Sequence, residues 1–196
     1  VNTQGVVLCL LNRYDGHYRL DCPSRGELIP AGLRRGSEAA VRQWLSKLDP
    51  APYNPFSLVL ISAGGVRRLL WDGKQAQRDK PAIDPWFFMT SSGERFTEVE
   101  ATRRRQFERW DSGDRRFLGP FPAAHLYCDP DDPGSSILVE RSYAHSKSVV
   151  RIEVKQQRVE LHYLFPESLQ RWRAAGRREV PDYETRQLSI YAVQEA

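Results

Sequence analysis

The residues best placed for chemistry follow the first apolar run of the chain. Residues 6–11 read Val-Val-Leu-Cys-Leu-Leu, and Asn12 and Arg13 come directly after them. This unbroken run predicts a central strand over residues 5–12 with both faces buried, because a half-exposed strand alternates polar and apolar residues. Such a strand would deliver Asn12 and Arg13 to the rim of a core, where sites often form. The same residues could instead be polar only because the end of the strand is exposed to solvent, and both interpretations stay open.

Cysteine and histidine give no clear site of their own. The three cysteines are Cys9, Cys22 and Cys128, an odd number without a CxxC pair, which argues against a disulfide scaffold and favours a reducing cytoplasm. The four histidines lie far apart and without the spacing of metal ligands, so the sequence predicts no metal and no cofactor. Cys9 sits inside the apolar run, where burial is expected to raise its pKa and leave little thiolate.

The strands that position these residues are expected in pairs. Residues 56–61 and 66–71, joined through Ala63-Gly64-Gly65, predict a β-hairpin. The aromatic run at residues 86–90 predicts a short buried strand. Further strands are expected at residues 148–154 and 158–165, as a second hairpin, and at residues 188–193.

Helices are expected between these strands. Ser37 precedes a helix over residues 41–48, whose apolar side chains recur at helical spacing. Residues 91–94, Ser-Ser-Gly-Glu, have the form of a capping box that opens a long helix to about Trp110. Its solvent-exposed side is expected to carry Arg103, Arg104 and Arg105. The pattern predicts one α+β domain over residues 1–196, with largely antiparallel sheet.

The charge pattern restricts the partners. The net charge is +4, and the arginine clusters mostly have acidic residues nearby. A solvated surface of mixed charge is therefore favoured over a nucleic-acid interface. The apolar runs are too short for a membrane span.

Six short segments, taken in order, resemble one family. They are Val1-Asn2-Thr3-Gln4-Gly5, Leu10-Leu11-Asn12-Arg13-Tyr14, Ser24-Arg25-Gly26-Glu27-Leu28, Tyr53-Asn54-Pro55-Phe56-Ser57-Leu58-Val59, Met89-Thr90-Ser91-Ser92 and His145-Ser146-Lys147-Ser148-Val149-Val150. The set is similar to NRDE proteins, the family of the transport and Golgi organisation protein and its bacterial relatives. The resemblance extends from Val1 to about Phe165.

The resemblance implies the Ntn-hydrolase fold, an αββα sandwich of two antiparallel sheets between helical layers. Relatives with this fold, such as choloylglycine hydrolases and penicillin acylases, use an N-terminal Cys whose thiol attacks an amide and whose α-amino group is the base. The sequence lacks the Met-Cys start, the Asn-Arg-Asp-Glu motif and the Gly-Gly-Thr-Trp strand expected before Val1. We therefore expect that an upstream part of the fold, with its nucleophile, is missing; a chain complete without it would be a relative without amidase activity.

The resemblance also implies roles for three residues. It places Asn12 in the oxyanion hole, where an N–H donor is worth about 3 kcal/mol. It places Ser91 at a strand-to-helix junction where relatives carry a polar residue, and His145 near an Arg position of hydrolases with this fold. The alternatives are an Asn12 that bonds its own loop, a Ser91 that caps the next helix, and a His145 that is an ordinary surface residue.

Two functions follow from the resemblance. The first is hydrolysis of linear amide (C–N) bonds once the upstream Cys segment is present. The second is binding or carriage of a small molecule, such as a lipid or haem, without chemistry. A nucleic-acid-binding protein ranks last. The expected partners are thus a small-molecule substrate or ligand, and an upstream segment or a second copy of the chain.

Overall fold

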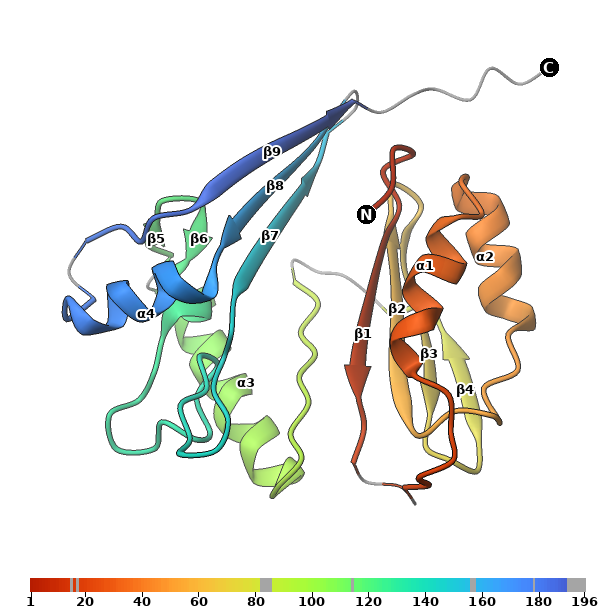
Figure 1. The fold of residues 1–196 in the computed structure, drawn as a ribbon, viewed down its shortest axis with the longest axis horizontal. Helices are drawn as coiled ribbons and strands as arrows, with labels where there is room; N and C mark the ends of the chain where they lie inside the picture. The colour runs from red at the N-terminus through yellow and green to blue at the C-terminus, as the bar shows by residue number, and fades with distance from the viewer. Residues whose placement is uncertain are drawn as a thin grey trace. The chain divides into compact units, whose positions relative to one another are not determined.

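The structure is a computed structural model that describes residues 1–14, 16, 18–81, 86–113, 115–155, 158–177 and 179–189. The chain divides into two compact units. The first comprises Val1–Phe96, Val154–Arg158 and Ser189–Ala196, and the second comprises Thr97–Glu153 and Val159–Leu188. Helices and antiparallel strands occur in both, which agrees with the predicted α+β class (Figure 1).

A four-stranded antiparallel sheet forms the centre of the first unit, in the order β1-β2-β3-β4. Its strands are β1 (Val7–Asn12), β2 (Phe56–Ser62), β3 (Gly65–Trp71) and β4 (Ala76–Asp79). The predicted hairpin is confirmed as β2 and β3. Gly65 starts β3 with a φ of +99°, a conformation that glycine adopts without strain. The first five residues of β2 are all buried.

The prediction that residues 5–12 form a central strand was wrong, because β1 lies at an edge of the sheet. Among the described residues β1 pairs with β2 alone, from Val7 opposite Ile61 to Asn12 opposite Phe56. Its first two residues are buried and the next four are partly exposed. An apolar sequence indicates that the side chains on both faces of a strand are buried. It does not indicate whether the backbone of the strand is hydrogen-bonded on both edges.

Two helices, α1 (Leu28–Leu33) and α2 (Glu38–Lys47), cover one face of this sheet (Figure 1). The Ser37 hydroxyl accepts a hydrogen bond from the Ala40 N–H and caps α2, as predicted. Pro30 lies in the first turn of α1, where a missing N–H breaks no helical hydrogen bond. The buried core under the helices consists of Val6, Leu8, Leu28, Val41, Leu45, Phe56, Leu58, Leu60, Leu69 and Trp71.

The prediction of a buried strand at residues 86–90 was also wrong. This segment forms neither strand nor helix, and Trp86 is 44% exposed. Phe87 instead lies against Arg68 of β3, with the guanidinium carbon 5.6 Å from the ring centroid. Arg68 is opposite Val59, on the sheet face away from the helix-covered Leu58 and Leu69. The run is apolar because Phe87 packs on the sheet surface, and not because the segment pairs into the sheet.

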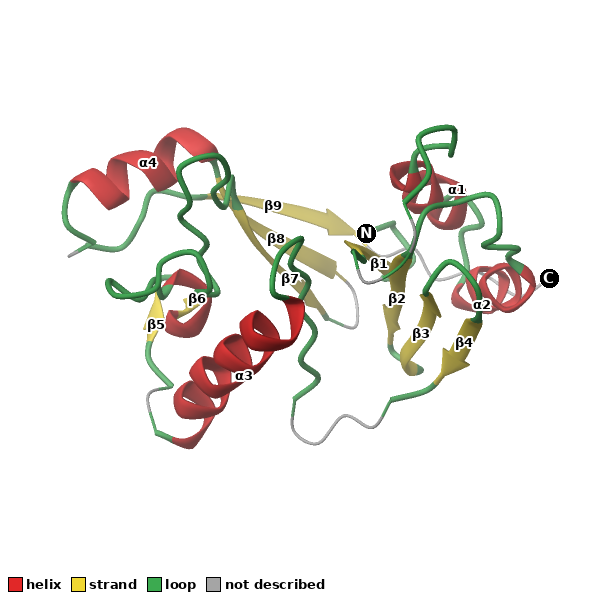
Figure 2. Cartoon of the chain, turned by 90° about the horizontal axis from the view of Figure 1, so that it is seen from below, coloured by secondary structure: helices red, strands yellow, loops and turns green. Residues whose placement is uncertain are grey.

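The second unit contains a three-stranded sheet of order β7-β8-β9, seen in Figure 2. Its strands are β7 (Val149–Val154), β8 (Arg158–Leu164) and β9 (Glu184–Ser189), so the second predicted hairpin is confirmed. The last strand begins earlier than predicted, and residues 190–193 lie outside the described residues. The helix α4 (Pro166–Ala174) contributes Leu169 and Trp172 to the core of this unit.

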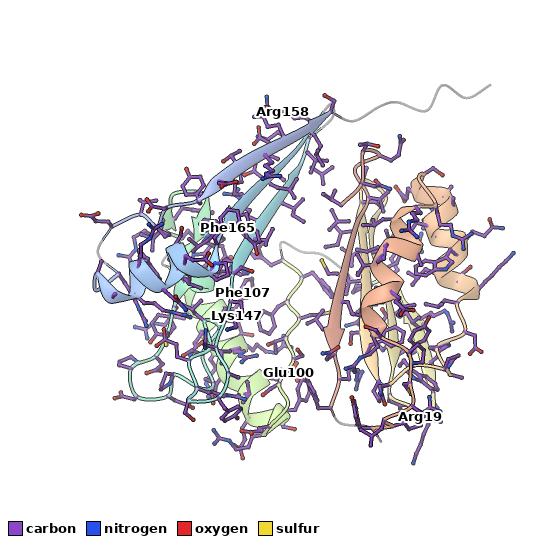
Figure 3. The ribbon with its side chains drawn as sticks, viewed as in Figure 1. Arg19, Glu100, Phe107, Lys147, Arg158 and Phe165 are labelled. Carbon is purple, nitrogen blue, oxygen red and sulfur yellow. The ribbon has the colours of Figure 1, made fainter. Side chains whose placement is uncertain are left out.

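The long helix α3 (Phe96–Ser112) precedes three short elements, β5 (Phe117–Leu118), β6 (Phe121–Pro122) and η2 (Ala123–Leu126). On α3, Glu100 pairs with Arg104 one turn later, and the ring of Phe107 lies 5.7 Å from that of Trp110 (Figure 3). Within the described part of the chain, no helix combines the length and hydropathy that a bilayer span requires.

Arg103 of α3 is buried, which corrects its predicted place on the solvent-exposed side of the helix. Its Nε donates to the Ser136 carbonyl at 2.9 Å. Burial lowers the pKa of Arg103, and the nearby charge of Arg141 acts in the same direction. The aliphatic part of an arginine side chain can be buried when its guanidinium donates to a carbonyl group. Three consecutive arginines therefore do not all have to lie on the solvent-exposed face of a helix.

Candidate functional site

Asn12, the first predicted site residue, ends β1 at a corner of the first unit. It is partly exposed, and its Nδ2 donates to the Tyr14 hydroxyl across a long 3.4 Å hydrogen bond. The next residue is fixed by its backbone, because the Arg13 N–H donates to the Pro55 carbonyl at 3.1 Å. Arg25 also donates to that carbonyl, from Nη1 at 2.6 Å. The strand end is therefore held in place while the Asn12 amide remains accessible.

Ser91, the second predicted site residue, lies in the same unit as Asn12, in an irregular segment. A Cβ built on Gly93 would touch the Tyr14 ring at 3.8 Å, so this segment lies beside the residue that Asn12 contacts. The neighbouring Ser92 is buried, and its hydroxyl donates to the Glu94 carbonyl at 2.7 Å. The helix α3 begins only at Phe96, two residues after the predicted capping box. Asn12 and Ser91 thus lie in one unit, and the irregular segment of Ser91 approaches Tyr14 at Gly93.

His145, the third predicted site residue, lies in the second unit. It forms an isolated antiparallel bridge with Glu140, and its side chain is exposed. Its Nε2 lies 3.2 Å from Nζ of Lys147, which Figure 3 labels. The described residues therefore join Asn12 and Ser91 within one unit, and His145 stands in the other unit among exposed polar groups.

The thiols are poorly suited to attack. Burial raises the pKa of Cys9, which lies opposite Val59 in the sheet. Burial also raises the pKa of Cys128, against the opposing effect of a hydrogen bond with Arg177. Each thiol is therefore mostly protonated at neutral pH and a weak nucleophile.

A cationic groove lies between α2 and the β3–β4 strands of the first unit. Its volume is about 520 Å³. Its lining includes five basic residues and one acidic residue: Arg42, Arg67, Arg68, Arg78, Lys80 and Asp79. The side chains of Arg68 and Asp79 lie on the sheet face away from α2. Of these arginines, Arg67 and Arg68 form one of the clusters that the sequence predicted to lie on a mixed-charge surface. The missed signal was the alternation of Arg67 with Leu69, and of Arg78 with Lys80, on neighbouring strands.

Three residues of the second unit could hold a metal ion by their donor types. Ligand atoms of Glu153, Glu160 and His162 all lie within 4.8 Å of one another. Each is engaged by a protein group: Glu153 by Arg151 at 2.7 Å, Glu160 by Gln187 at 3.3 Å, and His162 Nδ1 by Thr185 at 3.0 Å. Ligand spacing along the sequence could not indicate this group, because its members lie on paired strands.

The second unit also contains a partly buried cluster of ion pairs. Glu140 Oε1 lies 2.8 Å from Arg173 Nε and 2.7 Å from Arg177 Nη2. The Arg173 contact is a charge contact without hydrogen-bond alignment. Burial lowers the pKa of Arg173, and the charge of Glu140 opposes this shift. The cluster fastens the Glu140 segment to α4 and the residues that follow this helix, which is a structural role.

Comparison with known proteins adds no relative to these observations. A scan against protein-family models finds no match to this chain, and a search of the curated proteins finds none either. Function is therefore inferred from the residues and their geometry.

Proposed function

We propose that this chain belongs to an NRDE-like protein of Ntn-hydrolase fold that cleaves linear amide (C–N) bonds when its N-terminal Cys segment is present. The order of the six sequence segments supports the family. The antiparallel sheet with α1 and α2 on one face supports the fold, because an αββα sandwich contains such a half.

The observation that carries the proposal is the position of the Asn12 amide. It stands at the end of β1, next to Arg13, whose backbone N–H is bound to the Pro55 carbonyl. Among the described residues, the Asn12 side chain makes one hydrogen bond, of 3.4 Å to Tyr14. A hydrogen bond of this length is weak, so exchanging it for a bond to substrate costs little. An oxyanion donor needs a fixed backbone and a free N–H, and Asn12 offers both.

In the proposed reaction the upstream Cys thiolate attacks the carbonyl carbon of the amide. The carbonyl oxygen gains negative charge and accepts a hydrogen bond from Asn12 Nδ2. The C–N bond then breaks, and the amine leaves with the proton that the α-amino group took from the thiol. Water hydrolyses the thioester and releases the acid and the free thiol. Ser91, in the same unit as Asn12, would orient the polar groups of the substrate. The role of His145 stays a prediction.

A small-molecule carrier without chemistry is the second candidate. The observation that favours it is the groove of about 520 Å³, a size usual for small ligands. Its basic lining suits a lipid or haem only through an anionic group. We place either protein in the cytoplasm, because Cys9, Cys22 and Cys128 are free thiols.

The test uses the coding sequence extended upstream, assayed against a panel of N-acyl amides. Replacing Asn12 with Ala should lower kcat by about 100-fold, since one oxyanion donor is lost. Cys9→Ala is the matched control on the same strand and should leave kcat nearly unchanged, at a stability cost of about 1–2 kcal/mol. Unchanged turnover in Asn12→Ala would remove the oxyanion role. An extended protein that binds ligands and hydrolyses none would favour the carrier.

A further inference from the structure

The groove of the first unit is built from two faces that each present polar side chains at regular spacing. From α2 come Ala39, Arg42, Gln43 and Ser46, at the i, i+3, i+4 and i+7 positions of one helix face. From the sheet comes the face that carries Leu69 and its cross-strand partner Arg78. Arg67 and Lys80 continue the same alternation on β3 and just after β4. Figures 1 and 2 both show α2 along this side of the sheet.

The acidic groups at the groove are already used. Asp79 accepts two hydrogen bonds from Arg68, one of them from Nε at 2.8 Å, and this pairing lowers the pKa of Asp79. Glu38 lies 3.7 Å from Arg42 and also accepts from the Gly64 N–H at 3.3 Å. Neither carboxylate therefore neutralises the rest of the lining.

One further cation is fixed by the helix. Arg78 donates to the carbonyls of Leu45 and Leu48 at the C-terminal end of α2, at 3.5 Å and 2.6 Å. This holds its guanidinium at the groove wall and satisfies helix carbonyls that lack intrahelical partners. Arg67 and Lys80 remain, and within the described residues neither makes an ion pair or a side-chain hydrogen bond.

We propose that this groove binds a small molecule through a phosphate group, or a pair of linked phosphates. Positive charges held close together repel, and a multiply charged anion between them relieves the repulsion. Arg67 can bind two phosphate oxygens, Lys80 adds a point charge, and the Gln43 amide offers a neutral donor to a remaining oxygen. The groove is at the β4 edge and the Asn12 corner is at the β1 edge, so this inference does not depend on amide hydrolysis.

Isothermal titration of residues 1–196 with sodium pyrophosphate tests the site. Arg67→Gln/Lys80→Gln should weaken binding by about tenfold or more, because it removes the two unpaired cations. The matched control is Arg34→Gln/Arg35→Gln, which removes the same charge from exposed positions outside the groove lining. It should change the affinity by less than about twofold. Equal weakening by both variants, or no binding by the parent chain, would overturn the site.

A single variant and a vesicle experiment complete the test. If the double groove variant fails to fold, Lys80→Gln alone, at an exposed position, should still weaken binding by about threefold; an unchanged affinity would count against the site. Sedimentation with phosphatidylcholine vesicles containing phosphatidic acid separates a lipid headgroup from a soluble phosphate. Capture of vesicles that is lost in the groove variant and kept in the control assigns the phosphate to a lipid, and titration by pyrophosphate alone assigns it to a soluble ligand.

Discussion

The two edges of the four-stranded sheet carry opposite kinds of sequence. The β1 edge is apolar on both faces and is composed of Val7, Leu8, Cys9, Leu10, Leu11 and Asn12, whereas the β4 edge is Ala76, Gln77, Arg78 and Asp79 and is mostly exposed. Charged edge strands resist pairing with another chain, and apolar edge strands invite it. The β4 edge is thus suited to meet solvent and a charged ligand, and the β1 edge is suited to receive another strand.

This difference locates the two proposed sites. The Asn12 corner lies at the end of the apolar edge, where a further strand from the same protein or from a second copy would complete its surroundings. The cationic groove lies at the charged edge, and its proposed phosphate site needs no additional strand or helix. The four predictions that follow test whether the edges differ as their sequences indicate.

The largest effect is expected for a core residue of the β1 edge. Leu8 is 6% exposed and packs in the core under α1 and α2, so Leu8→Ala should lower the free energy of unfolding by about 3 kcal/mol. Gln77→Ala on the exposed β4 edge is the matched control and should change it by less than about 0.5 kcal/mol. Urea unfolding measures both. Similar losses at the two edges would contradict the asymmetry.

A glycine of α1 should give the next largest effect, with an unusual sign. Exposed helix positions gain stability when Ala replaces Gly. A Cβ on Gly32, however, would collide with the Leu8 side chain and would reach Trp44 at 2.6 Å. We therefore expect Gly32→Ala to destabilise the fold by about 2 kcal/mol. Gly26→Ala, whose Cβ would stand 3.4 Å from Ser24 Oγ, is the control. A higher melting temperature for Gly32→Ala would show that α1 does not pack closely on β1.

A smaller difference between the two edges is expected in the self-association of the chain. Leu11 is partly exposed near the end of β1, and Leu11→Lys places a charge on the apolar edge. The association constant of residues 1–196, measured by sedimentation equilibrium, should fall by about tenfold. Gln77→Lys adds the same charge to an edge that is already charged and should leave association unchanged. A parent chain that remains monomeric at high concentration would show that β1 attracts no further strand.

Much of this fold could be predicted from local sequence. The hairpin of β2 and β3, the Ser37 cap and the helix α2 follow from alternation, capping chemistry and helical periodicity. The edge position of β1 could not be predicted, because burial of its faces and pairing of its backbone are separate properties. The strand β4 forms from one alanine and three polar residues, and its strand conformation comes from pairing with β3 rather than from an apolar pattern.

The sites were less predictable for a related reason. Asn12 could be singled out because the end of an apolar run is visible in the sequence. The groove combines α2 with β3 and β4, and the Glu153–Glu160–His162 group spans a strand pair. Such contacts are set by register, which depends on long-range pairing. Arg103 was misassigned because its acceptor, the Ser136 carbonyl, is 33 residues away in the sequence.

The smallest effect is expected for the Arg68–Asp79 pair, which tests the charged edge through pH. The hydrogen bond from Arg68 lowers the pKa of Asp79, so the folded state favours the ionised carboxyl. A lowered folded-state pKa contributes stability above the unfolded value of about 3.9, and this contribution is lost as the pH falls through the folded value. Asp79→Asn should therefore destabilise the protein at neutral pH by less than about 1 kcal/mol, because the pair is partly exposed. As the pH falls below the unfolded value, the difference between variant and parent should shrink. Asp21→Asn, at an exposed carboxyl without a side-chain partner among the described residues, is the control. Urea unfolding across this pH range would contradict the pairing if the Asp79→Asn deficit stayed constant into acid.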